Sequence, residues 1–563
     1  MEIKKNDKFT VTIEDMGEDG AGIGRVDGYI WFVKDALIGD TIEASAMKMK
    51  KNYGFARLVR VIAPAKGRVE AKCPVARACG GCQLQELDYK EQLKFKEKKV
   101  YNHLKRIGGM ENLFLPEEAD QAAGVPDAVI MEPIIGMEDP WRYRNKAQYP
   151  IGRGKDGKPT AGFFAGRTHS LIPVPELDCL LGCGENKDYL AAVLKFMEDF
   201  GVEPYDEANH KGLVRHVLLR KGFASGEHMV CLVINGKKLP HEKEFTERMR
   251  EVGADSISLS FNMEKTNVIL GTEIKNLYGP GYITDKIGNI EYRISPLSFY
   301  QVNPVQTERL YGTALEFADL NGGETVWDLY CGIGTISSFL AQKAGKVCGV
   351  EIIPVAIEDA RENAKRNGLD NVEFFVGKAE EVLPEQYEKN HIKADVIVVD
   401  PPRKGCDELC LETIVKMAPE KVVYVSCDSS TLARDVKYLG ENGYAVKRVR
   451  TVDMFGMSGH VETVVLLSKG EVDSKKIRVE FSLEDMDMSE FQDGATYTQI
   501  KDYVLEHSGL KVSNLYISQI KRKCGIEVGK NYNLPKSEDS RQPMCPPEKE
   551  KAIREAFKYF GMI

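Results

Sequence analysis

The fold is decided by the stretch 325-TVWDLYCGIGT-335, in which an apolar strand runs directly into a glycine-rich loop. The run that follows, to Ala344, has the pattern of a helix. Glycines let the backbone come close to a ligand, and the N-terminus of the next helix favours a negative group. A second apolar strand, Lys346 to Val350, ends in Glu351. An acid about 20 residues past such a loop is placed to bind ribose hydroxyls. The sequence therefore predicts an α/β fold with a nucleoside-type cofactor.

The loop is not a full G-x-G-x-x-G, and the chain has no G-x-x-x-x-G-K-[ST]. Dinucleotides and nucleoside triphosphates are therefore poorer fits than another nucleoside. A third strand, Ala394 to Val399, ends in Asp400-Pro-Pro-Arg403. Polar side chains at the ends of successive strands predict a doubly wound, Rossmann-like sheet.

A thiol follows another predicted strand. The segment 424-YVSCDSSTLARD-435 carries Cys427 after the strand Lys421 to Val425 and before a helix that begins near Thr431. Glu462, 35 positions further on, opens a second apolar strand. A thiolate attacks soft electrophilic carbon well, and a nearby carboxylate can act as a base. From these two motifs alone, a buried structural cysteine and an ordinary strand-end glutamate remain an equal alternative.

The chain resembles the S-adenosylmethionine-dependent RNA uracil-C5 methyltransferases in five stretches between about 280 and 469. These are Ser298-Phe-Tyr-Gln-Val-Asn303, Asp328-Leu-Tyr-Cys-Gly-Ile-Gly334, Asp400-Pro-Pro-Arg403, Ser426-Cys427-Asp428 and His460-Val-Glu462. The resemblance implies that Cys427 is the nucleophile and Glu462 the base. It also implies methyl-donor contacts from four residues, which are Gln301, Tyr330, Glu351 and Asp400. Two details depart from relatives: Thr335 stands in place of an Asn, and Asp428-Ser429 in place of the commoner Asn-Pro.

A second group of cysteines lies upstream. Cys73, Cys79 and Cys82 fall in 73-CPVARACGGCQ-83, and Cys179 follows in 173-PVPELDCLLGC-183. Such spacing suits either zinc or a four-iron cluster. The family resemblance implies a [4Fe–4S] cluster held by these four thiols, with Cys183 as an alternative fourth ligand. We expect the cluster to shape the fold and the RNA contact, because methyl transfer needs no redox step.

The charge is unevenly distributed. The whole chain has a net charge of −8, yet residues 1–110 hold 21 Lys and Arg against 15 Asp and Glu. Residues 45–69 contain seven basic residues and no acid, interleaved with Tyr53 and Phe55. This pattern predicts a surface that follows RNA phosphates and stacks on bases, with a solvated strand face as the alternative. Short alternating strands are predicted at 9–13, 29–33, 40–43 and 55–61, with glycines at 17, 20, 22, 24 and 28 between them, and residues 1–62 resemble the TRAM domain, an OB-like β-barrel.

We divide the chain into four predicted domains. These are the barrel at 1–62, a central cluster-bearing α+β domain at 63–290, the methyltransferase domain at 291–469 and a small helical appendage at 470–563. The appendage contains helices predicted at 498–507, 513–524 and from Pro547 to Phe560, with the spacing of a helix-turn-helix. Strands are predicted over 141–149 and 213–220, and they present Arg142, Arg144, Lys146 and Arg220 to RNA or to solvent.

The sequence thus predicts a methyltransferase that modifies carbon 5 of uridine in 23S rRNA. Thirteen cysteines, a charged start and no apolar run of ~18 residues favour the cytoplasm. Three alternatives stay open. The substrate could be tRNA; the enzyme could be a cytosine-C5 methylase, although the Pro-Cys loop of that class is absent; or the protein could be a non-catalytic RNA-binding or assembly factor.

Overall fold

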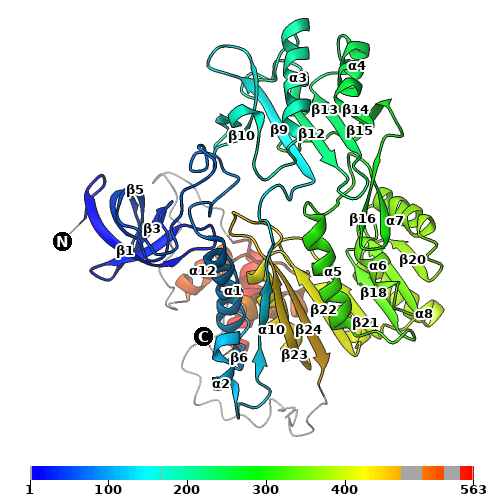
Figure 1. Cartoon of the computed structure of the whole chain (residues 1–563). Helices are drawn as coiled ribbons and strands as arrows, with labels where there is room; N and C mark the ends of the chain where they lie inside the picture. The colour runs from blue at the N-terminus through cyan, green and yellow to red at the C-terminus, as the bar shows by residue number, and fades with distance from the viewer. Residues whose placement is uncertain are drawn as a thin grey trace. The chain divides into compact units, whose positions relative to one another are not determined.

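The computed structural model describes residues 3–166, 168–470, 497–524, 526, 545–560 and 562. It consists of two compact units, Met1–Val472 and Asp473–Ile563. The first unit contains a closed barrel, a seven-stranded sheet and an eight-stranded sheet (Figure 1).

The barrel is closed in the strand order β1-β2-β3-β5-β4. Its strands are β1 (Lys8–Met16), β2 (Gly22–Val26), β3 (Tyr29–Lys34), β4 (Thr41–Met49) and β5 (Tyr53–Ala63). Inward side chains such as Val11, Trp31 and Ile42 fill it. The sequence did not predict β2, because its glycines were interpreted as turn residues between strands. Glycine is needed there because a Cβ on Gly24 would lie 2.5 Å from the carbonyl oxygen of Thr12.

The seven-stranded sheet has the order β11-β10-β9-β12-β13-β14-β15. Its strands are β9 (Lys146–Arg153), β10 (Pro159–Phe164), β11 (Leu171–Pro173), β12 (Val214–Lys221), β13 (His228–Ile234), β14 (Ser256–Phe261) and β15 (Glu273–Tyr278). Helices α3 (Asn186–Phe200) and α4 (Glu242–Val252) share its apolar core. The strand predicted from Trp141 begins only at Lys146, since Arg142 has a φ of 54° and cannot continue an extended run.

The eight-stranded sheet has the order β20-β19-β18-β21-β22-β24-β23-β8. Strands β18 to β22 run parallel, whereas β24 lies antiparallel between β22 and β23. The bounds are β8 (Glu132–Ile135), β18 (Thr325–Leu329), β19 (Lys346–Glu351), β20 (Val372–Val376), β21 (Val396–Val399), β22 (Lys421–Ser426), β23 (Tyr444–Val452) and β24 (Glu462–Lys469). Alternate residues of these strands enter two different apolar clusters, as a sheet covered on both faces requires.

Helices cover both faces, which confirms the doubly wound fold. One cluster includes side chains of α1 (Tyr89–Arg106), α8 (Ala379–Asn390), α9 (Glu408–Met417) and α10 (Ser429–Glu441). The other includes α5 (Pro304–Ala318) and α6 (Thr335–Leu340), together with the hairpin of β16 (Ile283–Ile287) and β17 (Ile290–Ile294). Helix α7 (Pro354–Arg366) packs against β20.

Two elements of the sheet domain come from the range that the sequence assigned to the central domain. Strand β8 pairs in parallel with β23, in the register Arg450↔Glu132, and α1 packs against α10. The short elements nearby are β6 (Leu113–Phe114), the 3-10 turn η1 (Pro116–Glu118), α2 (Ala119–Ala122) and β7 (Val129–Ile130); a second 3-10 turn, η2 (Pro175–Leu177), precedes α3. The eight-stranded sheet is therefore built from two separate stretches of chain.

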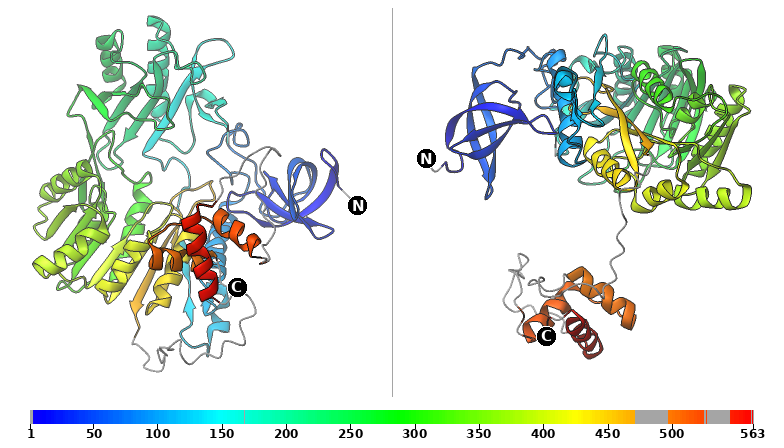
Figure 2. Two further views of the ribbon diagram at one scale, coloured as in Figure 1. Left: turned by 180° about the vertical axis from the view of Figure 1, so that it is seen from behind. Right: turned by 90° about the horizontal axis from the view of Figure 1, so that it is seen from below.

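The second unit is helical (Figure 2). It contains α11 (Tyr497–Ser508), α12 (Asn514–Lys523) and α13 (Pro547–Tyr559), close to the three helices that the sequence predicts. Their apolar faces share one core around Ile517, Ile553 and Phe557. In neither unit does a described helix combine the length and the apolar character that crossing a membrane demands.

Candidate active site

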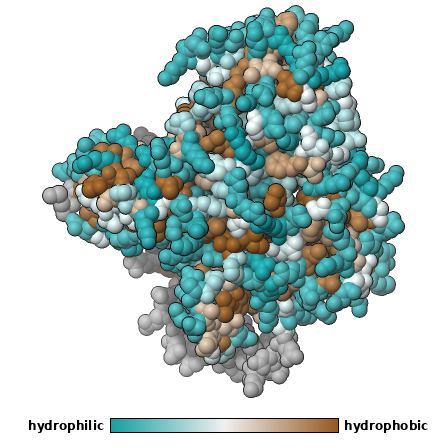
Figure 3. Space-filling view, in the orientation of Figure 1, coloured by the Kyte–Doolittle hydropathy of each residue, from teal (hydrophilic) through white to brown (hydrophobic). Residues whose placement is uncertain are grey.

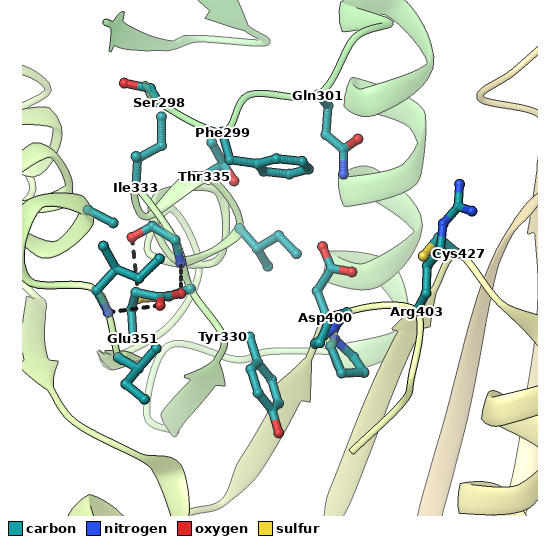
Figure 4. A pocket seen from close by; sticks show the side chains of 18 of the residues that line it. Ser298, Phe299, Gln301, Tyr330, Ile333, Thr335, Glu351, Asp400, Arg403 and Cys427 are labelled. Carbon is teal, nitrogen blue, oxygen red and sulfur yellow. Dashed lines mark hydrogen bonds between the residues drawn. The ribbon is translucent and has the colours of Figure 1, made fainter. Parts of the chain in front are cut away.

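The carboxyl ends of the parallel strands open into a cavity of about 1600 Å³. All six catalytic and cofactor residues suggested by the sequence line it, which are Gln301, Tyr330, Glu351, Asp400, Cys427 and Glu462. Figure 4 shows Glu351 and Cys427 on opposite sides of Asp400. Pockets for one small ligand have volumes of about 300–1,000 Å³. This cavity therefore has room for a cofactor and a second ligand side by side.

The register of two neighbouring strands places the thiol and the acid together. Ser426, the last residue of β22, pairs with Thr463 of β24 in an antiparallel ladder. Cys427 follows Ser426 and Glu462 precedes Thr463, so the two lie opposite each other at the end of that ladder. Helix α10 begins immediately after the thiol, where Asp428 Oδ1 accepts hydrogen bonds from the backbone N–H groups of Ser430 (3.0 Å) and Thr431 (3.1 Å). The loop is thus held by an N-cap instead of a proline.

Burial controls the protonation of these groups. It raises the pKa of Glu462 to about 8 and that of Asp400 to about 7. Burial, together with these two carboxyls, raises the pKa of Cys427 to about 12, and Arg403 opposes the shift. Arg403 lies beside the thiol in Figure 4. The carboxyls hold much of their proton near neutral pH, so they do not oppose a thiolate with full negative charges.

The other end of the cavity suits a nucleoside. Glu351 ends β19, and its two carboxyl oxygens accept hydrogen bonds from the backbone N–H groups of Gly332 (3.3 Å) and Ile353 (3.0 Å) (Figure 4). Gly332 and Gly334 have positive φ angles of 55° and 76°, which glycine adopts without strain. The fixed carboxylate keeps free lone pairs that can accept hydrogen bonds from ribose hydroxyls.

The motif from Ser298 to Asn303 forms another wall. Phe299 is 66% exposed and lines the cavity, so it is not part of the core, whereas Tyr300 is buried. The sequence suggested that Arg220 faces RNA or solvent, and the structure shows that it faces neither. It is 5% exposed, and its Nη2 donates to the carbonyl oxygen of Ser298 at 2.5 Å. Arg220 thus anchors the wall from β12, a contact that strand alternation alone could not indicate.

Residues 225–470 match the family described as tRNA (Uracil-5-)-methyltransferase, and residues 4–59 match the TRAM domain. A protein of Halalkalibacterium halodurans named as an uncharacterized RNA methyltransferase is 49% identical over 467 residues, which cover 83% of this chain and 98% of that protein. The chain belongs to the RNA uracil-5-methyltransferase family. A Clostridium tetani protein, also named as an uncharacterized RNA methyltransferase, is 48% identical over 469 residues, or 83% of this chain and 97% of that one.

The methyltransferase is also similar to a crystal structure. This is the tRNA (uracil-54, C5)-methyltransferase of Pyrococcus abyssi in complex with S-adenosyl-L-homocysteine, with a TM-score of 0.64 and 27% identity. The similarity covers 82% of this chain and 100% of that one. These matches confirm the predicted TRAM barrel, the methyltransferase fold and the dependence on S-adenosylmethionine.

The upstream cysteines surround a second cavity of the methyltransferase, of about 400 Å³. Cys73, Cys79, Cys82 and Cys179 all line it. Cys183 is absent from this lining, and its Sγ donates to the carbonyl oxygen of Arg144 at 3.2 Å. Among the described residues, no group of three or more His, Cys, Asp or Glu is arranged to hold a single metal ion. The cysteine sulfurs bound to a four-iron cluster lie further apart than those bound to one metal ion, so the absence of a single-ion site from the described residues does not test for a cluster.

The remaining wall of this cavity suits an anionic group. Arg144 and Lys146 line it, and the buried Nε of Arg144 has no hydrogen-bond partner among the residues that the structure describes. Four thiolates around a cluster would bring negative charge to these cations. Gly81, Arg144 and Leu181 line both cavities, so the cysteine site adjoins the methyltransferase cavity.

The TRAM barrel presents basic and apolar side chains together. Lys48, Lys50, Lys51 and Arg57 are exposed, and so is Tyr53. Figure 3 shows hydrophobic side chains among hydrophilic ones over the barrel. Such a surface can bind phosphates and stack on unpaired bases. The observation agrees with an RNA-binding role for this part of the methyltransferase.

Proposed function

We propose that this methyltransferase transfers the methyl group of S-adenosylmethionine to carbon 5 of a uridine in 23S rRNA. The nucleophile would be Cys427 and the base Glu462. The observation that carries the proposal is the β22–β24 register, which brings a thiol and a carboxyl with a raised pKa to one end of one cavity.

The chemistry requires both groups. Carbon 5 of uracil is a poor nucleophile, so the Cys427 thiolate first adds to carbon 6 and makes carbon 5 enolate-like. S-adenosylmethionine, when bound, would supply an electrophilic methyl carbon: carbon 5 would bond to it as the methyl–sulfonium bond breaks, and S-adenosylhomocysteine would leave. Glu462 removes the remaining proton from carbon 5, the C5–C6 double bond forms again, and the bond from carbon 6 to Sγ breaks. The uridine must leave the RNA stack to meet the thiol.

Four residues would hold the cofactor. Glu351 would accept hydrogen bonds from the ribose hydroxyls, and Gln301, Tyr330 and Asp400 would complete the site. Tyr330 has a positive φ of 69°, a conformation that a bulky residue adopts only where its surroundings impose it. Phe299 is available to stack on the adenine or on the flipped base.

We further propose a [4Fe–4S] cluster on Cys73, Cys79, Cys82 and Cys179. All four of these cysteines line the second cavity and Cys183 does not, which supports Cys179 over Cys183 as the fourth ligand. The unpaired Nε of Arg144 in the same lining supports an anionic group there. The cluster takes no part in the reaction and serves to fix the loop that borders the active site. Iron and acid-labile sulfide analysis tests this assignment, and stoichiometric zinc in the isolated protein would overturn it.

The choice between rRNA and tRNA rests on the family resemblance of the barrel and the cysteine site. The solved P. abyssi relative is named for tRNA, so tRNA is the second candidate. The deciding experiment is tritium release from RNA labelled at uracil carbon 5, with S-adenosylmethionine, on 23S rRNA and on bulk tRNA. Release from 23S rRNA that disappears in Cys427→Ala supports the proposal. Release from tRNA alone overturns the substrate, and no release from either RNA favours a non-catalytic RNA-binding factor.

A further inference from the structure

The segment that leads into the proposed base is held from outside the sheet. Residues 453–461, here called the base loop, join β23 to Glu462, the first residue of β24. No hydrogen bond to the Glu462 carboxyl comes from within the described ranges of the chain. The position of this carboxyl therefore follows its backbone, which the ladders of β24 hold on one side and the base loop holds on the other. Met457, in the middle of the base loop, has a φ of 65°, and this strained conformation requires support from its neighbours.

Helix α1 supplies part of that support from its buried face. This face comprises Gln92, Lys96, Val100 and Leu104, spaced four residues apart. Lys96 Nζ donates to Asp453 Oδ1 at 2.6 Å and to the carbonyl oxygen of Phe455 at 2.9 Å. Tyr89, on the same helix, donates its hydroxyl to Asp453 Oδ2 at 2.8 Å. The side chains of Lys96 and Asp453 are fully buried, so this hydrogen-bonded pair fixes the start of the base loop.

Gln92 connects the base loop to the cysteine site. Its Oε1 accepts from the backbone N–H of Met457 at 3.1 Å, and its Nε2 donates to the carbonyl oxygens of Leu84 (3.0 Å) and Leu87 (2.8 Å). The Met457 carbonyl oxygen accepts in turn from the backbone N–H groups of Gln83 (2.9 Å) and Leu84 (3.0 Å). Gln83 directly follows Cys82. One fully buried amide thus links a cysteine ligand candidate to a point five residues before Glu462.

The thiol is held by different contacts. Asp428 caps α10, and Ser429 Oγ lies 2.8 Å from Nδ1 of His103. Neither contact involves the base loop or Gln92. Gln92 itself therefore bonds to the base loop and not to the loop of Cys427, which His103 of the same helix contacts.

We propose that Gln92 is a positioning residue for the base: together with the cysteine loop, which bonds to Met457 directly, it holds the base loop that leads to Glu462. The proposal rests on the proposed function, in which Glu462 acts only after the thiol has added and the methyl group has moved. A displaced base then slows the last step alone. The covalent protein–RNA adduct accumulates, although it forms at a normal rate.

The test compares adduct formation with adduct resolution in single turnovers of the full-length protein. Gln92→Leu keeps the approximate size of the side chain and removes all four of its hydrogen bonds, the fourth being from Nε2 to Met457 Sδ at 3.3 Å, whereas Gln92→Glu keeps an acceptor for Met457. Reactions with labelled 23S rRNA fragments are quenched in denaturant, and adduct and free RNA are separated on a denaturing gel. For Gln92→Leu we expect the ratio of adduct to released product to rise between about 10- and 100-fold. Adduct formation should stay within about 3-fold, and Gln92→Glu should give a smaller rise.

Val100→Ala is the matched control, because Val100 lies on the same face of α1 and contacts neither loop through a hydrogen bond. The cavity that it creates should lower the melting temperature without changing the ratio. If Gln92→Leu slows formation as much as resolution, its role is only structural and the proposal fails. If Gln92→Leu does not fold, Gln92→Glu decides, and an unchanged ratio there overturns the proposal.

Glu462→Gln separates this inference from the proposed function. If Glu462→Gln traps the adduct but the Gln92 variants resolve it normally, the positioning role is wrong and the base assignment stands. If Glu462→Gln traps no adduct while tritium release is lost, the base assignment itself is wrong.

Discussion

The molecule holds thiols in two ways. Cys427 stands at the end of β22, where the backbone ladder to β24 sets its position opposite an acid. Cys73, Cys79, Cys82 and Cys179 lie outside the helices and strands, on segments that meet around a small cavity. Sheet register can place a side chain without any ligand, whereas loops depend on what their side chains bind. Substitution of the sheet thiol should therefore abolish the reaction and leave the structure intact, whereas substitution of a loop thiol should destabilise the structure and lower activity less.

The largest effect should come from Cys427→Ala. Loss of the nucleophile should lower methylation by at least about 10⁴-fold. Because β22 and α10 keep their hydrogen bonds, the melting temperature should change by less than about 2 °C. Tritium release and a thermal scan measure these two quantities. A large fall in melting temperature would contradict the distinction between the two kinds of thiol, because Cys427 would then also stabilise the fold.

The pH dependence of adduct resolution should show the next effect. Burial raises the pKa of Glu462 to about 8, and only its deprotonated form can accept the C5 proton. Resolution of a preformed adduct should thus become faster as the pH rises from 6 to 8, by about 10-fold per unit at the acid end, and level off above pH 8. Chasing the adduct in buffers from pH 6 to 9 measures it. A rate that is flat across this range would remove Glu462 from the base role.

Cys79→Ser should have a smaller effect on activity and a larger one on structure. We expect iron to be lost, the melting temperature to fall by several degrees and methylation to fall by roughly 10-fold, as the loop beside the active site loosens. Cys183→Ser is the matched control, since Cys183 is a nearby buried thiol that does not line the cysteine cavity. Iron analysis, thermal scans and tritium release compare the two variants. Equal iron loss in both would mean that Cys183 is a ligand.

The smallest effect should follow truncation after Lys469. The match to the H. halodurans relative covers 98% of that protein but only 83% of this chain. That relative is therefore similar in length to this chain without its second unit. Activity on short RNA should stay within about 2-fold, because both thiol regions lie in the first unit. The tritium assay on full-length and truncated protein measures this. A large loss would show that at least one thiol region needs the second unit.

Local sequence signals predicted the elements that carry the chemistry. The apolar run from Lys421 predicted β22 almost to its end, and Glu462 and Glu351 lie at strand ends as expected. The barrel was predicted except for β2, where close packing selects glycines that read as turns. The contacts between distant segments were not predicted, because alternation in a strand says which residues share a face but not what covers it. Arg220 bonds to Ser298, and Lys96 to Asp453, across gaps that no local pattern spans.

Strand β8 has a consequence for synthesis on the ribosome. Glu132 pairs with Arg450, so the edge of the eight-stranded sheet is made more than 300 residues before its partner strand. At about 5–20 residues per second, β8 and α1 wait about 15–60 s for the rest of their domain. All strands of the seven-stranded sheet are made within that interval. We expect that sheet to fold first, while the apolar faces of α1 and β8 depend on chaperones or on the barrel for cover until the rest of their domain is made.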